Sequence, residues 1–151
     1  MIGALLRIPV DAVRARMLAG LHAAGFTDLN AAHLPLLRWP GPVGRRPSEL
    51  AADAHMSKQA MNYLLGEMER LGYLIRRRDP DDLRSRRVHL TPRGEAVVRT
   101  IRATVREIEE ELERELGAER FAQLKRGLAD LNATSLVHGR PALAPGARRT
   151  A

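Results

Sequence analysis

RRRDPDDLRSRRVHLT, residues 76–91, constrains the architecture of this chain more than any other stretch. Six arginines lie on either side of a turn rich in proline and aspartate. Leu74 and Ile75 precede the first arginines, and Val88-His89-Leu90 follows the last, so both arms carry alternating apolar residues as strands do. A charge run alone is typical of a solvated face or a disordered tail. The two apolar arms instead predict a β-hairpin with a cationic tip, which raises the question of which anion the tip contacts.

Length and composition favour one mainly helical domain. A chain of 151 residues with 44% hydrophobic content can bury a core of its own. Aromatic residues make up only 3%, so the core must be aliphatic. Leu, Ala, Glu and Arg are frequent, and these residues favour helix over sheet.

The positive charge is localised. The formal net charge is +7, residues 38–94 hold 12 basic and 7 acidic side chains, and residues 95–135 hold 7 basic and 9 acidic ones. With a sequence pI near 11.1, this distribution indicates a polyanionic partner, either nucleic acid or an anionic membrane surface.

Several classes of function are excluded or disfavoured. The chain has no cysteine, which removes disulfides, thiolate metal sites and thiol redox sensing. No apolar stretch approaches the roughly 18 residues of a membrane span, and the first residues do not resemble a signal peptide. The five histidines are scattered, with no metal-binding or catalytic spacing. The basic segments also lack the interleaved Trp, Phe or Leu that an interfacial helix buries. We therefore expect a cytoplasmic protein that is not an enzyme, with no metal, no cofactor and no membrane association.

Helix signals divide the first part of the chain. Periodic apolar residues predict a helix over residues 4–24, interrupted early by Pro9 and ended by Gly25. A second short helix is expected over residues 30–37, before the Trp39-Pro40-Gly41-Pro42 loop. Ser48 is the predicted N-cap of a third helix over residues 49–54.

The fourth predicted helix begins after Ser57 and ends at Leu71, before Gly72. Its apolar positions recur with helical spacing and should face the core: Ala60, Met61, Leu64, Leu65, Met68 and Leu71. The opposite face is polar: Lys58, Gln59, Asn62, Tyr63, Gly66, Glu67 and Arg70.

Helices also follow the hairpin. Thr91-Pro92 gives an N-cap and then a proline at the first helical position, which predicts the start of a long helix ending at Gly117. Residues 118–136 form a last amphipathic helix, and residues 139–151 are expected to be disordered.

Two short helices joined by a tight turn, the second with a polar outer face, are the elements of a helix-turn-helix. The second would enter the major groove of DNA. Lys58 suits guanine or phosphate, the amides of Gln59 and Asn62 suit adenine, and Tyr63 suits phosphate or a thymine methyl. An ordinary solvated helix face is the alternative for this helix taken alone.

A cationic hairpin directly after such a helix is a wing. Arg84 at its tip would enter the minor groove, where the negative potential attracts guanidinium groups. Asp82, two residues earlier, would orient Arg84 by a charge-assisted hydrogen bond. Four further arginines on the arms are phosphate contacts or solvated edge residues: Arg76, Arg77, Arg86 and Arg87.

The order of these elements, followed by LGYLIRRRDPDDLRSRRVHLTPRGEAVV at residues 71–98, resembles the MarR family of winged-helix transcriptional regulators. The family signature is Asp-x-Arg in the wing and Leu-Thr-x-x-Gly at the entry into a long helix. The matching residues are Asp82, Arg84, Leu90, Thr91 and Gly94. The resemblance covers residues 29–136 in element order.

The resemblance implies a single MarR-like domain over residues 1–138. Residues 29–94 would form the winged helix-turn-helix, and residues 1–28 and 95–138 the dimerisation helices. It also implies a homodimeric regulator, expected to be a repressor, that binds double-stranded DNA at a near-palindromic operator and is often released by a small molecule. Pro9 departs from this pattern in the dimerisation region, and without cysteine the peroxide sensing of part of the family cannot operate.

An effector pocket should lie where the N-terminal helices and the long helix meet the winged region. The candidate lining residues are His22, Phe26, His33, Arg38 and Trp39, each of which could equally be a core or surface residue. One alternative function stays open, namely a winged-helix interaction or assembly module that binds DNA weakly or non-specifically. Such a module would carry an uncharged wing and an apolar recognition face.

Overall fold

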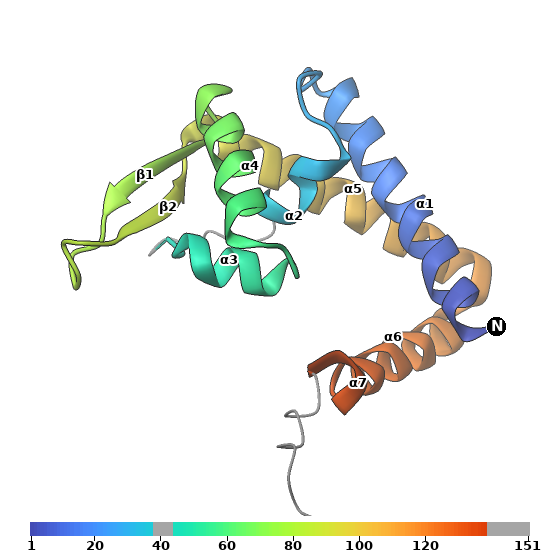
Figure 1. Ribbon diagram of the computed structural model, residues 1–151. Helices are drawn as coiled ribbons and strands as arrows, with labels where there is room; N and C mark the ends of the chain where they lie inside the picture. The colour runs from blue at the N-terminus through green and yellow to red at the C-terminus, as the bar shows by residue number, and fades with distance from the viewer. Residues whose placement is uncertain (38–43, 139–151) are drawn as a thin grey trace, which may run out of the picture. The chain divides into compact units, whose positions relative to one another are not determined.

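The computed structural model describes residues 1–37 and 44–138, apart from the side chains of Ser135 and His138. The chain separates into two compact units, residues 1–108 and 109–151. The first unit carries α1 to α4, the β1–β2 hairpin and the start of α5 (Figure 1). The second holds the end of α5 together with α6 and α7. The mainly helical fold with a two-stranded wing that the sequence predicts is confirmed.

Helix α1 runs without interruption over Ile2–Ala23, with Pro9 inside it. The prediction that Pro9 interrupts this helix is wrong. Proline removes the backbone hydrogen bond to the Leu5 carbonyl, but Leu5 is 74% exposed, so water can reach this part of the helix. Gly25, at a φ of +94°, follows the helix end as predicted.

The predicted second helix begins as a 3₁₀ turn, Ala31–His33, and continues as α2, Leu34–Leu37. The Asn30 side chain caps it by accepting the Ala32 N–H at 2.9 Å. The predicted loop at residues 39–42 lies outside the described residues.

Helix α3, Pro47–Asp53, begins earlier than the sequence suggested. Its N-cap is Arg46, and Ser48 lies inside the helix, so the prediction of Ser48 as the cap is wrong. The Arg46 backbone N–H donates to Glu49 Oε2 at 3.2 Å, which satisfies the helix start from within its first turn. Pro47 then occupies the first helical position, where its missing N–H costs nothing.

Helix α4, Lys58–Arg70, follows the predicted pattern closely. Ser57 Oγ accepts the Ala60 N–H at 3.1 Å, and Gly72 ends the helix region at a φ of +80°. The predicted inner residues are buried or half-buried, and α3 and the 3₁₀ turn Ala31–His33 pack against this helix. The core of the first unit is built mostly from aliphatic side chains: Leu21, Leu29, Leu34, Leu36, Leu37, Leu50, Ala51, Met61, Leu64, Leu65, Met68, Tyr73, Leu74, Val88 and Val97.

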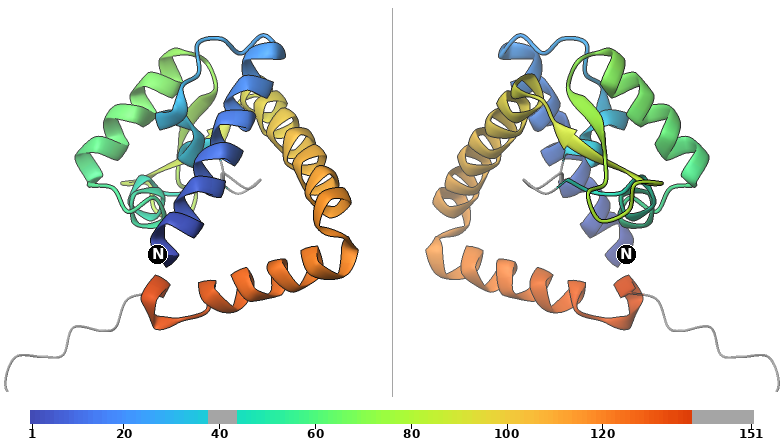
Figure 2. Two further views of the ribbon diagram at one scale, coloured as in Figure 1. Left: turned by 90° about the vertical axis from the view of Figure 1, so that its right-hand side faces the viewer. Right: turned by 90° about the vertical axis from the view of Figure 1, so that its left-hand side faces the viewer.

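Strands β1, Leu74–Arg78, and β2, Arg86–Leu90, form an antiparallel hairpin in which Arg76 pairs with Val88. The backbone of Arg45 adds a short bridge to Val88, with hydrogen bonds of 3.1 and 2.7 Å in the two directions. Arg45, the residue before the α3 cap, is therefore hydrogen-bonded to the edge of β2. Figure 2 shows α3 and α4 beside the hairpin from two opposite sides, and α3 contacts β2 while α4 contacts β1.

Helix α5, Pro92–Leu116, starts at the base of the hairpin as predicted. Thr91 Oγ1 accepts the Gly94 N–H at 3.2 Å and donates to the Gly72 carbonyl at 2.6 Å. Gly94 is buried against the chain at Tyr73, and a Cβ atom there would lie 2.1 Å from the Tyr73 carbonyl oxygen. Glycine is required at this junction because backbone occupies the space of a side chain.

The second unit contains α6, Ala118–Asn132, and the short α7, Ser135–His138. Gly117 separates α5 from α6 at a φ of +84°, as the sequence predicts for a helix end. Phe121 is buried, whereas Leu124 and Leu128 are 44% and 42% exposed. Helix α6 thus leaves part of its apolar face open. The predicted disordered tail lies outside the described residues.

Candidate nucleic-acid interface

The outer face of α4 is open to solvent. Lys58, Gln59, Asn62 and Tyr63 are all exposed, and Tyr63 keeps 73% of its surface accessible despite its aromatic ring. The opposite face is packed into the core, which fixes the rotation of the helix about its own axis. The structure therefore brings all four predicted base-reading residues onto one accessible face.

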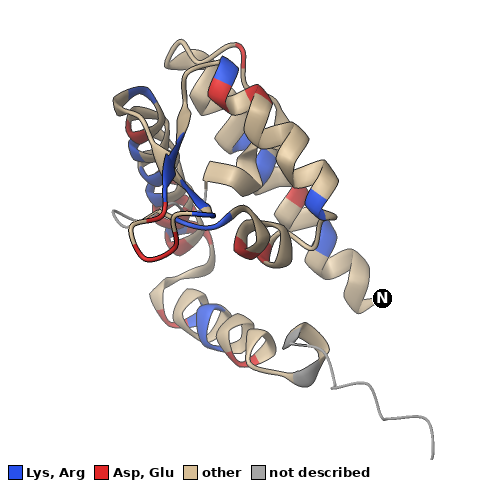
Figure 3. Cartoon of the chain, turned by 60° about the vertical axis from the view of Figure 1, so that its left-hand side comes forward, with Lys and Arg blue, Asp and Glu red and all other residues tan. Residues whose placement is uncertain are grey.

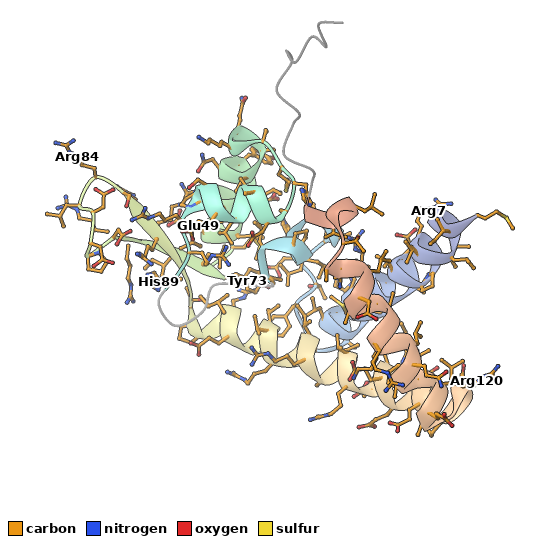
Figure 4. The ribbon with its side chains drawn as sticks, turned by 90° about the horizontal axis from the view of Figure 1, so that it is seen from below. Arg7, Glu49, Tyr73, Arg84, His89 and Arg120 are labelled. Atoms are coloured by element: carbon orange, nitrogen blue, oxygen red, sulfur yellow. The ribbon has the colours of Figure 1, made fainter. Side chains whose placement is uncertain are left out.

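Arg84 lies at the far end of the hairpin, and its side chain points away from the helices (Figure 4). Asp82 Oδ1 accepts the backbone N–H of Arg84 at 3.1 Å. The expectation that Asp82 orients the guanidinium directly is therefore corrected, because the carboxylate holds the backbone turn that presents Arg84. Asp82 supports the tip through turn geometry, as aspartate does in an Asx turn.

The other wing arginines predicted to bind DNA, Arg76, Arg77 and Arg86, divide into two groups. Arg76 is held by α4, since its Nε lies 3.3 Å from Glu69 Oε2 and its Nη2 donates to the Asn62 carbonyl at 3.3 Å. Arg77 and Arg86 are exposed, and in the part of the chain that the structure describes neither has an ion-pair partner. Basic residues follow both strands in Figure 3, while the acidic residues gather in the connecting loop.

Asp79, at the end of β1, is the centre of a cluster that the sequence interpretation missed. Its side chain is fully buried. Arg46 approaches Oδ2 at 2.9 Å and Arg87 approaches Oδ1 at 2.9 Å, while Ser85 Oγ donates to Oδ2 at 3.2 Å. The Asp81 backbone N–H donates a further hydrogen bond to Oδ1 at 3.0 Å. One carboxylate thus joins the α3 cap to both arms of the wing.

Burial acts to raise the pKa of Asp79, because it penalises the charged carboxylate. Hydrogen bonds from Arg87, the Asp81 N–H and Arg46 outweigh burial and hold the pKa of Asp79 well below its ordinary value of 3.8. The same pairing raises the pKa of Arg46. The Asp79 carboxylate therefore stays ionised at neutral pH. We call Asp79, Arg46, Arg87 and Ser85 the Asp79 cluster.

A cavity of about 290 Å³ lies between the start of α3, the start of α4 and the wing. Three cationic side chains line it, namely Arg46, Lys58 and Arg86. Hydroxyl and amide groups complete its polar lining: Ser48, Asn62 and Ser85. We refer to this space as the cationic cavity.

A second polar cluster lies at the base of the hairpin. The Tyr73 hydroxyl donates to Asp28, and Arg93 Nη2 donates to Asp28 Oδ2 at 2.9 Å and to the Tyr73 hydroxyl at 3.0 Å. The Arg93 guanidinium also lies 4.5 Å from the centre of the Tyr73 ring. Burial and the bond to Asp28 raise the pKa of Tyr73. This cluster at the base of the hairpin ties the loop after α1 to the start of α5.

The candidate effector residues have diverse surroundings. His22 is exposed, with Nε2 2.8 Å from the Leu29 carbonyl, and Phe26 packs edge-on against Tyr73. His33 is buried, and its ring lies between the Asn30 N–H and Glu67 Oε2, 3.2 Å from each. Arg38 and Trp39 lie outside the described residues. The cationic cavity contains none of these five residues.

Within residues 1–37 and 44–138, no group of three His, Asp or Glu side chains has an arrangement that could hold a metal ion. In the same described ranges, no helix has the length and apolar character needed to cross a membrane.

The fold and the site define a winged helix-turn-helix protein of the DNA-binding type. A family model described as MarR family matches residues 27–85. A MarR family protein of Mycobacterium tuberculosis, Rv2887, solved in complex with salicylic acid, is 30% identical. The match covers 87% of this chain and 96% of that protein, with a TM-score of 0.64. The chain belongs to the MarR family of DNA-binding transcriptional regulators, which are not enzymes.

More distant structures share the fold. The transcriptional repressor CouR, solved with a 23-mer DNA duplex, is 24% identical over 87% of this chain and 92% of its own, with a TM-score of 0.67. The ligand-free MarR protein of E. coli is 22% identical over 87% of this chain and 96% of its own, with a TM-score of 0.66. Among proteins with curated descriptions, none matches this chain.

Proposed function

We propose that this protein is a homodimeric, cytoplasmic repressor that binds a near-palindromic operator in double-stranded DNA. The observation that carries the proposal is the pairing of an exposed, amide-bearing face on α4 with a cationic wing beside it. A recognition helix reads base edges in the major groove, and a wing arginine contacts the neighbouring minor groove. CouR, solved with a DNA duplex, and a mutant of the S. aureus protein MepR, solved with an oligodeoxyribonucleotide, support this kind of partner for proteins of the same fold.

In this proposal the exposed residues of α4 read bases and those of the wing contact the backbone or the minor groove. Gln59 and Asn62 read adenine edges, with Lys58 and Tyr63 beside them. Arg84 enters the minor groove. Arg77 and Arg86 contact phosphates. Arg76 supports the recognition helix through Glu69, so its contribution to DNA binding is indirect.

Dimerisation is proposed through residues 1–28 and 95–138. The N-terminal part of α1 exposes large apolar residues, among them Ile2, Leu5 and Ile8, and α6 exposes Leu124 and Leu128. Apolar surfaces of this kind are typical of protein interfaces. Sedimentation at micromolar concentration should give a species of about twice the 16.8 kDa chain mass.

Selection of duplexes from a random library tests the specific-regulator proposal. The expected result is an inverted repeat with half-sites about one helical turn, ~10 bp, apart. Gln59→Ala and Asn62→Ala should each cost about 1–3 kcal/mol on that site and relax the preference at one base step. Recovery of no palindromic consensus would refute the proposal, and an equal loss on all duplexes would assign these residues to phosphate contacts.

Release by a small-molecule effector is part of the proposal. The salicylic acid complex of the 30% identical relative supports it. Salicylate titrated into the protein–operator complex should lower the DNA-bound fraction. If it does, substitution of Phe26, which lies at the edge of the core beside Tyr73, tests the pocket predicted from the sequence.

A further inference from the structure

The cationic cavity lies where a DNA strand has to pass. Adjacent major and minor grooves of a duplex are separated by one sugar-phosphate backbone. A protein that places α4 in the major groove and the wing tip in the neighbouring minor groove must therefore accommodate that backbone between the two elements. Lys58 and Asn62 of α4 face the cavity from one side, and Ser85 and Arg86 of the wing from the other.

The side-chain pattern of β2 explains why Arg86 reaches the cavity. Successive residues of a strand alternate between its faces, so Arg86 shares a face with Val88. Val88 is fully buried against the helical core. Arg86 is therefore directed toward the helices, where the described residues provide no carboxylate to pair with it.

Arg46 is held in place by the buried Asp79 carboxylate. Its Nε and Nη2 both lie within hydrogen-bonding distance of Asp79 Oδ2, at 3.0 and 2.9 Å. A guanidinium carries five N–H donors, so about three remain for an anion in the cavity. The side chain is 38% exposed, whereas its carboxylate partner has no exposed surface. Asp79 also pairs with Arg87, which Asp81 Oδ2 approaches at 3.3 Å as well, so what Arg46 offers the cavity is its remaining N–H donors, and Lys58 and Arg86 add positive charge beside them.

We infer that the cationic cavity binds one backbone phosphodiester of the operator per protomer, held by Arg46, Lys58 and Arg86, with Asp79 as the positioning residue for Arg46. This inference rests on the proposed function and adds a specific contact to it. Ser48 supplies a neutral donor near the same anion, whereas the Ser85 hydroxyl donates to Asp79 and the Asn62 amide is assigned to a base edge. Arg46, Ser48 and Asp79 were not among the residues expected from the sequence to act in DNA binding.

Single methylphosphonate substitutions test the inference, because each one removes the charge of one phosphate. In the selected operator duplex, one phosphate lies between the bases that α4 reads and the minor groove that the wing tip contacts. Neutralising this phosphate should weaken wild-type binding about tenfold or more. Arg46→Ala should bind the unmodified duplex more weakly and lose little further at that one position. Fluorescence anisotropy gives both ratios.

Arg45→Ala is the matched control. Arg45 is the neighbouring arginine, but its guanidinium pairs with Glu49 at 3.0 Å and Asp53 at 2.6 Å, and it does not line the cavity. The Arg45→Ala substitution removes the same charge as Arg46→Ala and should keep the wild-type response to every methylphosphonate. Asp79→Asn should reduce the response at the same phosphate as Arg46→Ala, provided that circular dichroism shows a folded protein. A loss spread equally over all phosphates would mean that Asp79 acts only on the fold.

Several outcomes would overturn the inference. The first is an Arg46→Ala protein that keeps the wild-type loss at every phosphate. The second is stabilisation of the DNA-free wild type by inorganic phosphate without any coupling to a backbone position, since the cavity would then be a free-anion site. Both leave the proposed function intact. Failure of the wild type to bind any duplex would overturn the inference and the proposed function together.

Discussion

Gly94→Ala should destabilise the first unit although alanine favours helices. In an open helix position the change from glycine to alanine stabilises by up to about 1 kcal/mol. At residue 94 the new Cβ would lie 2.1 Å from the Tyr73 carbonyl oxygen, and the Leu90 side chain is 2.9 Å away. Overpacking of this kind costs about 1–3 kcal/mol, and backbone yields less easily than a flexible side chain.

The Tyr73 carbonyl cannot move freely, because it accepts the Thr91 N–H at 3.1 Å. Breaking that bond adds about 1 kcal/mol to the cost. Subtracting the helix gain leaves a net destabilisation of roughly 1–3 kcal/mol. Urea unfolding at one fixed protein concentration measures it, since dimerisation would make stability depend on concentration.

Gly66→Ala is the control for this prediction. Gly66 lies in α4, and an added Cβ would meet only Arg76 Nη2, at 3.8 Å. This variant should gain up to about 1 kcal/mol. If Gly94→Ala is as stable as wild type, or gains as much as Gly66→Ala, the argument that the hairpin base and α5 are in fixed contact is wrong.

Four other substitutions have expected outcomes. Arg84→Ala should weaken operator binding and reduce the salt dependence of log Kd by about 1 per protomer. Asp82→Ala should weaken binding less, because it alters only the turn that presents Arg84. Equal affinity of Arg84→Ala and wild type at moderate salt would refute the minor-groove role. Because the pKa of Asp79 lies below its unfolded value near 3.9, its carboxylate stabilises the fold above that pH, and the contribution is lost as the pH falls below it. Asp79→Asn should therefore be less stable than wild type at pH 7, and the difference in unfolding free energy should shrink below about pH 4. Denaturant unfolding at a series of acidic pH values measures this difference. If the difference is the same at every pH, the pairing of Asp79 with the arginines is contradicted. Tyr73→Phe removes the hydroxyl that joins Asp28 to Arg93 and should cost about 1 kcal/mol in the same unfolding assay, whereas no loss would show that Arg93 pairs with Asp28 equally well alone.

The parts of the fold that the sequence predicts are those with local causes. The two faces of α4 follow from the spacing of its apolar residues, and its start follows from Ser57. The hairpin follows from two short apolar arms around a turn. Thr91 and Pro92 specify where α5 begins. In each case the residues that determine the element are adjacent in the chain, so a pattern of periods and caps is sufficient.

The parts that escaped prediction depend on distant residues. Asp79, Asp81 and Asp82 look alike in the sequence, and only Asp79 is buried, because Arg46 approaches it from a segment 33 residues away. The signal available in the sequence was a carboxylate followed by proline at the end of a strand, which does not reveal burial. The cap of α3 was misplaced because Arg46 caps through its backbone N–H and Glu49, without the usual short polar side chain.

The hairpin is fixed to the helices at both of its ends by residues outside the proposed base-reading face. At the base, Tyr73 and Thr91 hold it to the start of α5, and near the turn Asp79 holds it to the cap of α3. The gap between α4 and the wing is therefore set by buried polar contacts, while the exposed residues determine which bases are read. Substitutions in these buried polar contacts should change affinity for all DNA sequences alike. Substitutions on the outer face of α4 should change the preferred sequence, so the two properties are separable by mutation.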